Sequence, residues 1–471
     1  MVERSDSADN EPVAFLGDAS MRIAVVGCGY VGLVTAACLA ELGHEVVGVD
    51  DDTHKITLLS KGQIPIFESH LAELVAGNVK RGRLKFTRDI VPASQQAEVI
   101  FICVGTPPLE NGEADLSAID KVARAVANNC QTYKVVVEKS TVPVRTGHEL
   151  ERILRVYGAR SGFTYDVVSN PEFLREGTAV EDFLHPDRIV IGAQSEKARA
   201  MLEELYRPIL EQTFKCPVHR NCVERPKPRF LATDIASAEL IKHASNSFLA
   251  LKISYVNALA DLCETFGADV TMVAEGMGAD RRIGHAFLRP GIGFGGFCFP
   301  KDLQAFIRIA ERGGHDFALL REAEKINLGR IDHFVEKLRS ALWVIADKQI
   351  AVLGLSFKPN TDDIRFSPAL AVVSRLLEHK AKVRVYDPKA MEKTKQAFPQ
   401  LTYCRDAYEA ASGSEALLLT TEWEDFRTLD WARIQESMGR ALVLDGRNFL
   451  DAKELAALGF EYHSIGRPKL P

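Results

Sequence analysis

Short apolar runs alternate with amphipathic stretches along the first half of the chain. The runs begin with MRIAVVG at 21–27, HEVVGVD at 44–50, AEVIFICVG at 97–105 and YKVVVEKS at 133–140, and continue with YDVVSN and RIVIG. Runs of this length, rich in Val and Ile and separated by helical patterns, are typical of βαβ units around a buried parallel sheet. The pattern predicts a doubly wound, Rossmann-like α/β domain over residues 21–228.

One long helix is predicted next. Residues 231–266 contain neither Gly nor Pro, and apolar residues occur at 241, 248, 251, 255, 258 and 262. These steps of three, four and seven residues place them on one helix face. About 35 residues give a helix of roughly 50 Å, long enough to bridge two domains and to form part of a subunit interface. We predict a central helical dimerisation domain over residues 229–330.

The opening pattern recurs in the last part of the chain. KQIAVLGLSFK at 348–358 resembles the first strand and turn, AKVRVYDP at 381–388 resembles the second strand, and SEALLLTT and RALVLDGRN supply further buried runs. The second strand–turn–helix lacks the glycine pattern of the first, so the two domains should bind different ligands. The predicted fold is therefore two doubly wound Rossmann-like domains, 21–228 and 331–471, joined by a helical domain with one long central helix.

Charge and composition narrow the function. The net charge is −6, and the first 20 residues, which are polar and acidic, are predicted to be a disordered tail. No basic footprint of a nucleic-acid-binding protein is present. An uncharged stretch at 23–40 could suggest a membrane span, but three glycines interrupt it and a strand follows at once. We predict neither a nucleic-acid partner nor a membrane segment.

The nine cysteines are odd in number and scattered. We find no CxxC pair and no Cys/His spacing of a metal site, so we predict no metal and free thiols in a reducing cytoplasm.

A glycine-rich turn follows the first strand. Gly27, Gly29 and Gly32 form a GxGxxG pattern that opens a helix. Glycines at these positions permit a tight turn and close approach of the backbone to a pyrophosphate at the helix N-terminus. The alternative is a glycine turn that serves packing alone.

The second strand ends at Asp50, 23 residues after Gly27. A carboxylate there accepts hydrogen bonds from the adenosine ribose and repels a 2′-phosphate, so NAD is favoured over NADP. Asp51 and Asp52 are alternative ribose ligands, and Lys55 could lie along the adenine.

Two later strands end in loops with Gly, Pro and Thr. Thr106 lies in VGTPP at 104–108 and Thr141 in EKSTVP at 138–143. Ligands of such sheets bind at the carboxyl ends of the strands. We expect both threonines at the cofactor, although ordinary turns use the same residues.

The segment GIGFGGFCFPKD at 291–302 carries the candidate nucleophile, Cys298. Its four glycines should let the backbone approach a ligand, and Lys301 or a helix N-terminus should lower the pKa of the thiol. A nucleophilic Cys beside NAD can trap an aldehyde as a thiohemiacetal and, after a second hydride transfer, release an acid from a thioester. The alternatives are a buried structural Cys, a two-electron hydroxyacid-type dehydrogenase that needs no Cys, and a non-catalytic binding protein.

GCGYVG at 27–32 and GFGGFCFPKD at 293–302 together resemble the motifs of the UDP-glucose/GDP-mannose dehydrogenase family, over about residues 21–455. Phe297 stands where the family usually has Ser. The resemblance implies NAD-dependent four-electron oxidation of a nucleotide sugar, with UDP-glucose as the substrate and UDP-glucuronate as the product. HPDR at 185–188 favours this branch. GDP-mannose or a UDP-N-acetylhexosamine is the alternative substrate.

The resemblance also assigns roles to single residues. In SNPEFLREG at 169–177, Glu172 acts in acid/base chemistry. Lys242 and Asn246, four residues apart on one helix face, hold the developing oxyanion. Asp302 or Glu172 activates water. Arg282, or else Arg281, enters the neighbouring subunit's site, which implies a homodimer or a higher homo-oligomer.

The predicted site residues form three sets. The catalytic set is Cys298, Lys242, Asp302, Glu172, Asn246 and Thr141. The cofactor set is Gly27, Gly29, Tyr30, Val31, Gly32, Asp50, Lys55, Thr106, Thr141, Glu176 and Arg365. The substrate set is Glu172, Phe173, Leu174, Glu176, Lys242, Asn246, Arg282, Phe294, Gly295, Phe357, Lys358 and Arg447.

Overall fold

An eight-stranded sheet forms the first lobe of the computed structural model, which describes residues 20–159, 162–219, 222 and 225–468. The predicted acidic tail lies almost wholly outside these residues. The strand order is β3-β2-β1-β4-β5-β6-β7-β8, and each neighbouring pair is parallel except β6 and β7. The strands are β1 Arg22–Val26, β2 Glu45–Val49, β3 Leu84–Thr87, β4 Val99–Ile102, β5 Lys134–Glu138, β6 Tyr165–Ser169, β7 Arg188–Ala193 and β8 Arg229–Thr233.

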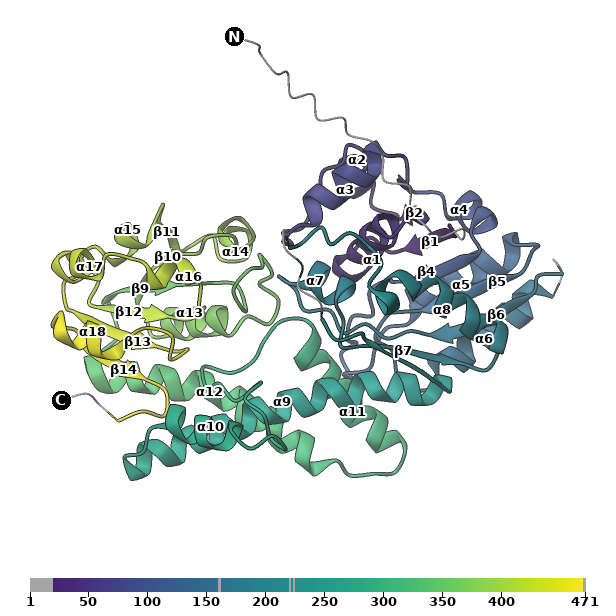
Figure 1. Ribbon diagram of the computed structural model, residues 1–471. Helices are drawn as coiled ribbons and strands as arrows, with labels where there is room; N and C mark the ends of the chain where they lie inside the picture. The colour runs from purple at the N-terminus through teal and green to yellow at the C-terminus, as the bar shows by residue number, and fades with distance from the viewer. Residues whose placement is uncertain (1–19, 160–161, 220–221, 223–224, 469–471) are drawn as a thin grey trace, which may run out of the picture.

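Helices cover both faces of this sheet (Figure 1). The uncharged stretch at 23–40 forms β1 and the buried helix α1, so its apolar residues lie in the core of the lobe. Among the described residues, no helix has the length and apolar character needed to cross a membrane. The helices are α1 Tyr30–Glu41, α2 Thr53–Leu59, α3 Leu71–Lys80, α4 Ile90–Gln96, α5 Ser117–Asn129, α6 Thr146–Gly158, α7 Ala179–Leu184 and α8 Glu196–Glu211.

Strand β8 differs from the prediction. Residues 229–233 were divided between a linker and the start of the long helix, but they pair in parallel with β7. The helix begins only at Ile235, because the Asp234 side chain accepts a hydrogen bond from the backbone N–H of Ser237 and caps the helix there. The sheet therefore extends five residues past the predicted boundary at 228.

The second lobe repeats the topology of the first. Its six strands are all parallel, in the order β11-β10-β9-β12-β13-β14, which matches the order of β3 to β6 in the first lobe. The strands are β9 Gln349–Leu353, β10 Lys382–Tyr386, β11 Thr402–Tyr403, β12 Ala416–Leu419, β13 Leu442–Asp445 and β14 Glu461–Ser464. The helices are α13 Pro368–Glu378, α14 Met391–Ala397, α15 Ala407–Ala411, α16 Glu424–Arg427, α17 Trp431–Ser437 and α18 Ala452–Ala457.

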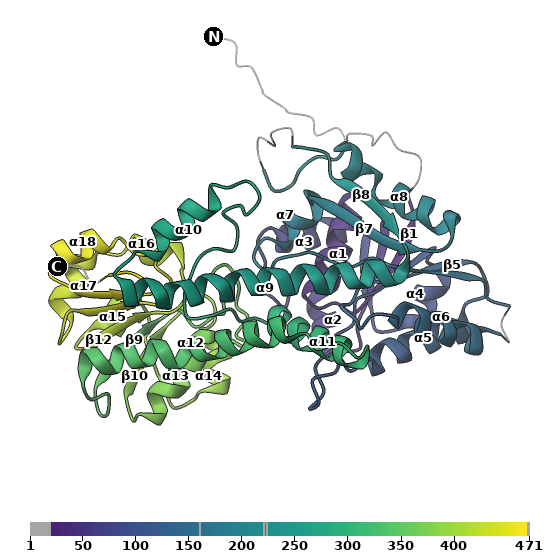
Figure 2. The ribbon, with the colours of Figure 1, turned by 90° about the horizontal axis from the view of Figure 1, so that it is seen from below.

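The predicted long helix joins the lobes. Figure 2 shows α9, Ile235–Phe266, running from beside one lobe to beside the other. It packs against β7 in the first lobe and against α12, Ala318–Leu342, below the second. Two shorter helices complete this region, α10 Val270–Gly278 and α11 Cys298–Arg312.

The apolar face predicted for α9 points away from its own chain. Phe248, Tyr255 and Leu262 are 61%, 52% and 53% exposed, whereas the buried face carries small or polar residues such as Lys242 and Asn246. Periodicity therefore identified the helix correctly. The core of this chain, however, packs against the face of α9 that carries small or polar residues, not against the predicted apolar face.

Candidate active site

The turn between β1 and α1 has the geometry of a dinucleotide loop. Gly27 has φ +97°, and a Cβ added there would lie 2.6 Å from the carbonyl oxygen of Cys103. A Cβ at Gly32 would collide with the carbonyl oxygen of Gly27. A Cβ at Gly29 would meet nothing within 4 Å. Two glycines therefore close the turn, and the third leaves open the space that a pyrophosphate needs.

Asp50 follows β2 beside this turn. Its Oδ2 accepts hydrogen bonds from the backbone N–H of Cys28 at 2.8 Å and from Nζ of Lys55 at 2.7 Å. Lys55 thus pairs with Asp50. Among the residues that the structure describes, Oδ1 is engaged only by the backbone N–H of Asp52, at 3.1 Å. A carboxylate has about four acceptor sites, so Asp50 keeps capacity for ribose hydroxyls.

A cavity of about 550 Å³ opens from this turn. Thr106 and Thr141 meet at its wall, where the Thr106 hydroxyl donates to the Thr141 carbonyl oxygen at 2.9 Å. Every predicted cofactor residue lines the cavity except Gly32, which lies beneath the turn. The lining residues from the predicted set are Gly27, Gly29, Tyr30, Val31, Asp50, Lys55, Thr106, Thr141, Glu176 and Arg365.

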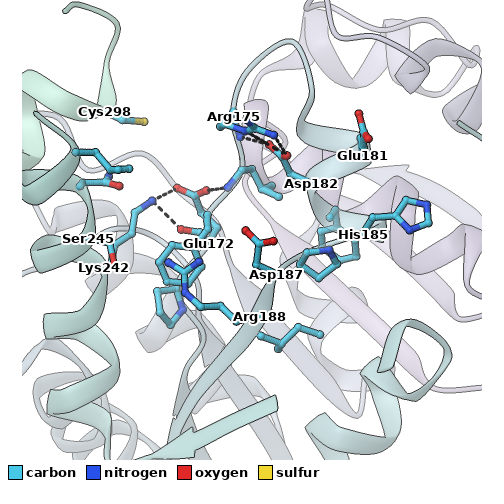
Figure 3. Close-up of a pocket in the computed structure, with 18 of the residues that line it drawn as sticks. Glu172, Arg175, Glu181, Asp182, His185, Asp187, Arg188, Lys242, Ser245 and Cys298 are labelled. Atoms are coloured by element: carbon cyan, nitrogen blue, oxygen red, sulfur yellow. Dashed lines mark hydrogen bonds and ion pairs between the residues drawn. The ribbon is translucent and has the colours of Figure 1, made fainter. Parts of the chain in front are cut away.

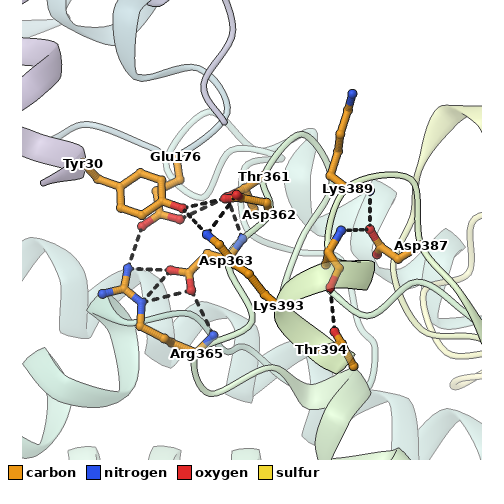
Figure 4. A network of polar contacts seen from close by, with 11 residues as sticks. Tyr30, Glu176, Thr361, Asp362, Asp363, Arg365, Asp387, Lys389, Lys393 and Thr394 are labelled. Atoms are coloured by element: carbon orange, nitrogen blue, oxygen red, sulfur yellow. Dashed lines mark hydrogen bonds and ion pairs between the residues drawn. The ribbon is translucent and has the colours of Figure 1, made fainter. Parts of the chain in front are cut away.

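The second lobe closes this cavity through polar contacts (Figure 4). The Tyr30 hydroxyl donates to Oδ1 of Asp362 at 2.7 Å, and Arg365 lies 3.3 Å from Glu176. Burial, followed by repulsion from Asp363, raises the pKa of Glu176 to about 8, although Arg365 opposes the shift. The network places residues of both lobes on one cofactor cavity.

A second cavity, of about 700 Å³, adjoins the first (Figure 3). Its walls include the predicted Glu172, Phe173, Leu174, Lys242 and Asn246. Three residues line both cavities: Lys139, Glu172 and Cys298. The thiol therefore lies where the two cavities meet.

Lys242 and Glu172 form a buried ion pair at this junction. Nζ of Lys242 donates to Oε1 of Glu172 at 2.8 Å and to its carbonyl oxygen at 2.7 Å. Burial would lower the pKa of Lys242, but the carboxylates of Glu172 and Asp302 outweigh it and raise the pKa above its usual value. Lys242 is therefore a protonated donor, suited to stabilising negative charge that develops on an oxygen.

Cys298 is the first residue of α11, which places its thiol at a helix N-terminus. The pKa of this thiol is raised rather than lowered. Burial, together with the carboxylates of Glu172 and Asp302, raises the pKa of the thiol to about 12, and the cation that opposes them is Lys242 rather than Lys301. The thiol must therefore lose its proton to a base as it reacts.

Asp302 and Asn246 form a second pair behind the thiol. Nδ2 of Asn246 donates to Oδ2 of Asp302 at 2.7 Å, and Nζ of Lys301 lies 2.8 Å from Oδ1. Burial would raise the pKa of Asp302, but Lys301 and Lys242 lower it below its ordinary value. Asp302 is thus a fully enclosed carboxylate, held by neighbours on both oxygens.

Family models cover most of the chain. Three domain models of the UDP-glucose/GDP-mannose dehydrogenase family match it. The NAD-binding domain matches residues 21–210, the central domain residues 236–328 and the UDP-binding domain residues 351–452. The chain belongs to this family. Its UDP-binding model covers most of the second lobe, which has the Rossmann topology without the GxGxxG turn.

Relatives and solved structures agree with the family. The UDP-glucose 6-dehydrogenase of Rhizobium meliloti (strain 1021) is 47% identical over 453 residues, 95% of this chain and 100% of the relative. TuaD, a UDP-glucose 6-dehydrogenase of Bacillus subtilis (strain 168), is 43% identical over 95% of this chain and 93% of its own. A UDP-glucose dehydrogenase structure from Pyrobaculum islandicum has TM-score 0.85 at 37% identity, covering 94% and 98% of the two chains. A UDP-D-ManNAc dehydrogenase structure from Pyrococcus horikoshii has TM-score 0.81 at 29% identity, covering 96% and 100%.

The glycines of the nucleophile loop approach protein rather than open space. A Cβ at Gly291 would lie 2.8 Å from the carbonyl oxygen of Gly446, and one at Gly295 would collide with that of Phe366. A Cβ at Gly296 would lie 2.6 Å from the ring of Phe357. We expected these glycines to admit a ligand, but in this structure they let the loop pack against the second lobe.

Several predicted substrate residues line neither cavity. They belong to the contact between the nucleophile loop, residues 291–302, and the second lobe, or lie near it. These residues are Phe294, Gly295, Phe357, Lys358 and Arg447. Nη1 of Arg447, for example, donates to the carbonyl oxygen of Gly293 at 3.1 Å.

Arg282 also lines neither cavity. Its side chain is 89% exposed and pairs with Asp280 of the same loop.

Lys139 is a site residue that the sequence analysis missed. It is buried, lines both cavities, and its Nζ donates to Oδ1 of Asn170 at 3.1 Å. It precedes Thr141 by two residues in a motif that was already identified. A signal was therefore available in the sequence, since a Lys at the end of a buried strand needs a polar partner.

Proposed function

We propose that this protein oxidises UDP-glucose to UDP-glucuronate with two equivalents of NAD, through a thiohemiacetal and a thioester on Cys298. One observation carries the proposal. The cofactor cavity and the cavity lined by Glu172 and Lys242 meet at the Cys298 thiol. A single thiol can therefore remain in place while the substrate carbon is oxidised twice.

The residues of the first cavity fit NAD. Gly29 leaves space beside the N-terminus of α1, and Asp50 retains an oxygen for ribose hydroxyls while disfavouring a 2′-phosphate. When bound, NAD supplies the hydride acceptor for both oxidations. Tyr30 and Arg365, contributed by opposite lobes, hold the cavity closed around it.

We assign the oxyanion role to Lys242. Its protonated amine donates to Glu172, and its positive charge favours the thiolate form of Cys298. It would stabilise the alkoxide of the substrate, the oxyanion formed when sulfur adds to the aldehyde, and the oxyanion formed when water attacks the thioester. Asn246 keeps Asp302 in position behind it.

We assign proton transfer to Glu172 rather than to Asp302. Glu172 lines both cavities, whereas Asp302 is fully enclosed and lines neither. Glu172 would take the thiol proton when Cys298 attacks and pass it to solvent, and would later take a proton from the hydrolytic water and return it to the departing sulfur. Asp302 then acts by charge, keeping Lys242 protonated.

A panel of nucleotide sugars tests the function. With UDP-glucose, two NADH should form per sugar, and Cys298→Ser should form no acid at a measurable rate while still binding NAD. Cys404→Ala, at a thiol in the second lobe, is the matched control and should keep full turnover. The P. horikoshii relative makes a UDP-N-acetylhexosamine the chief rival substrate. A preference for that sugar or for GDP-mannose, or a yield of one NADH, would contradict the proposal.

We further propose that the active form is a cytoplasmic homodimer built on the outward face of α9. All nine cysteines are free, as expected in a reducing compartment. The exposed apolar face of α9, which includes Tyr255 and Leu262, is a surface that a second copy would bury. Leu262→Asp should halve the mass measured by light scattering, whereas Leu109→Asp, on an exposed loop, should leave it unchanged.

Arg282 would then act in the partner's site. If so, mixing Cys298→Ser chains with Arg282→Ala chains under exchange should restore about one quarter of wild-type turnover, because half of the dimers are mixed and each has one complete site. No recovery, with exchange demonstrated, would place Arg282 in its own chain's site, and full turnover of Arg282→Ala alone would place it outside catalysis.

A further inference from the structure

Four side chains at the edge of the 700 Å³ cavity, of which His185 lines its wall, have the composition of a metal site. They are His185, Cys216, His219 and Cys222, and their ligand atoms all lie within 4.8 Å of one another. His185 follows α7, and the other three come from the connection between α8 and β8. Figure 3 shows His185 on the side of the pocket opposite Cys298.

The distances match one tetrahedral ion. Nε2 of His185 lies 3.2 Å from Sγ of Cys216 and 3.7 Å from Sγ of Cys222, and Nδ1 of His219 lies 3.4 Å from Sγ of Cys216. Zinc binds His nitrogen at about 2.0–2.1 Å and Cys sulfur at about 2.3 Å, so a regular tetrahedron has N–S edges of about 3.6 Å. The three measured edges scatter around that length.

Neighbouring groups prepare the donor atoms for a cation. The backbone N–H of His219 donates to Sγ of Cys216 at 3.3 Å, which favours a thiolate. Oε1 of Glu181 lies 3.4 Å from Nε2 of His219. When Nδ1 binds the ion, Nε2 carries the ring proton and can donate it to this carboxylate, as in the outer partners of known zinc sites.

The local charge also agrees with a divalent ion. Two thiolates balance Zn²⁺, and the two thiol protons pass to solvent when the ion binds. Arg225 is the nearby cation, with Nη2 3.2 Å from Nε2 of His219, and Glu181 compensates it through an ion pair at 3.0 Å. The immediate site therefore carries no uncompensated charge once zinc is bound.

We propose that His185, Cys216, His219 and Cys222 bind one structural Zn²⁺ per chain. Four protein ligands leave no open position, so the ion is structural rather than catalytic. It fastens the α8–β8 connection to the turn before β7. This turn supplies Asp187 to the cavity wall, and Arg188, the first residue of β7, follows it there. The proposal does not depend on the oxidation assigned to Cys298.

The prediction that the chain holds no metal came from spacing along the sequence. His185 lies 31 residues before Cys216, so only the fold brings the two together. The Cys-x2-His-x2-Cys run at 216–222 is nevertheless a signal in the sequence for three of the four ligands.

Metal analysis of the full-length protein, purified under reducing conditions without chelator, tests the proposal. We expect one zinc per chain by mass spectrometry. Cys222→Ser and His219→Gln should lower retained zinc at least tenfold against a competing chelator. Cys298→Ser and Cys263→Ala should keep one zinc, because both thiols lie outside the cluster. Retained zinc in the cluster variants would overturn the proposal.

Cobalt provides a second readout that does not require the variants to fold. After zinc is removed from the wild-type protein, Co²⁺ should restore one ion per chain and give the thiolate charge-transfer and visible bands of a tetrahedral site. The same titration should raise the Tm of the metal-free protein, because binding favours the folded state. Absence of both zinc and cobalt uptake, or a Cys216–Cys222 disulfide in the reduced preparation, would overturn the proposal.

Discussion

The two lobes share one strand order but use their first turn in opposite ways. In the first lobe, Gly27 has φ +97° and Asp50 accepts from the backbone N–H of Cys28. In the second, Gly354 has φ +95° and Asp387 accepts from the backbone N–H of Leu355 at 2.7 Å. The turns therefore coincide in conformation and in the carboxylate that supports them.

The difference lies in what fills the space around each turn. Oδ2 of Asp387 also accepts from the backbone N–H of Ser356 at 3.1 Å and from Nε1 of Trp423 at 3.1 Å, and the carboxylate is 1% exposed. Ser356, two residues after Gly354 as Gly29 is two residues after Gly27, is fully buried, and its carbonyl oxygen accepts from the Thr421 hydroxyl at 2.6 Å. In the second lobe, protein groups therefore occupy the position that is open beside Gly29 in the first lobe. A dinucleotide site thus needs an unfilled turn as well as the Rossmann topology.

Replacing one glycine in each turn by valine should give the largest effects, on NAD affinity in the first lobe and on the free energy of unfolding in the second. Gly29→Val places its side chain in open space, so the unliganded fold should persist while NAD affinity falls about 100-fold, or about 2.7 kcal/mol. Gly354→Val meets Thr421 at a positive φ and should lower the free energy of unfolding by about 2–4 kcal/mol. Calorimetric NAD titration and urea unfolding measure the two effects. Equal loss of NAD affinity in both variants would remove the distinction.

Replacing the carboxylate beside each turn by alanine should give smaller effects of the same kind, on the free energy of unfolding in the second lobe and on the KM for NAD in the first. Asp387→Ala leaves the buried N–H groups of Leu355 and Trp423 without an acceptor, which should lower the free energy of unfolding by about 2 kcal/mol. Asp50→Ala should raise the KM for NAD about tenfold with a smaller loss of stability. Initial rates against NAD concentration and unfolding curves for both variants check the pair. The comparison fails if Asp387→Ala alters the KM as much as Asp50→Ala does.

A single hydroxyl links the two turns. Tyr30 belongs to the glycine turn of the first lobe, and its hydroxyl donates to Asp362 of the second. Tyr30→Phe keeps the ring and removes this bond, so closure of the lobes should weaken by about 1 kcal/mol. The KM for NAD should rise about fivefold with no change in the number of NADH formed per sugar. Tyr157→Phe, on α6 away from the cavity, should leave the KM unchanged.

Sequence patterns predicted the features that depend on neighbouring residues. The glycine turn, Asp50 and the pair Lys242–Asn246 are defined by short spacings, and in the structure Asp50, Lys242 and Asn246 line the two cavities. The partners of the nucleophile-loop glycines were not predictable in this way, because Gly295 meets Phe366 from another domain. Periodicity likewise found the apolar face of α9 without indicating what would cover it.

The pKa of Glu176 gives the smallest expected effect, at the contact between the lobes. Its folded value of about 8, raised by burial and by Asp363, lies above the ordinary value of 4.5. The folded state therefore holds this proton more tightly than the unfolded state, and the stability that Glu176 contributes is lost as the pH rises from about 4.5 through about 8. Glu176→Gln does not titrate, so without NAD the free energy of unfolding of this variant should rise relative to that of the wild type across that range. Glu322→Gln, at an exposed helix position, should show no such difference from the wild type in the same series of urea unfolding curves. If the free energy of unfolding of Glu176→Gln declined with pH as the wild type does, the titration would belong to another group.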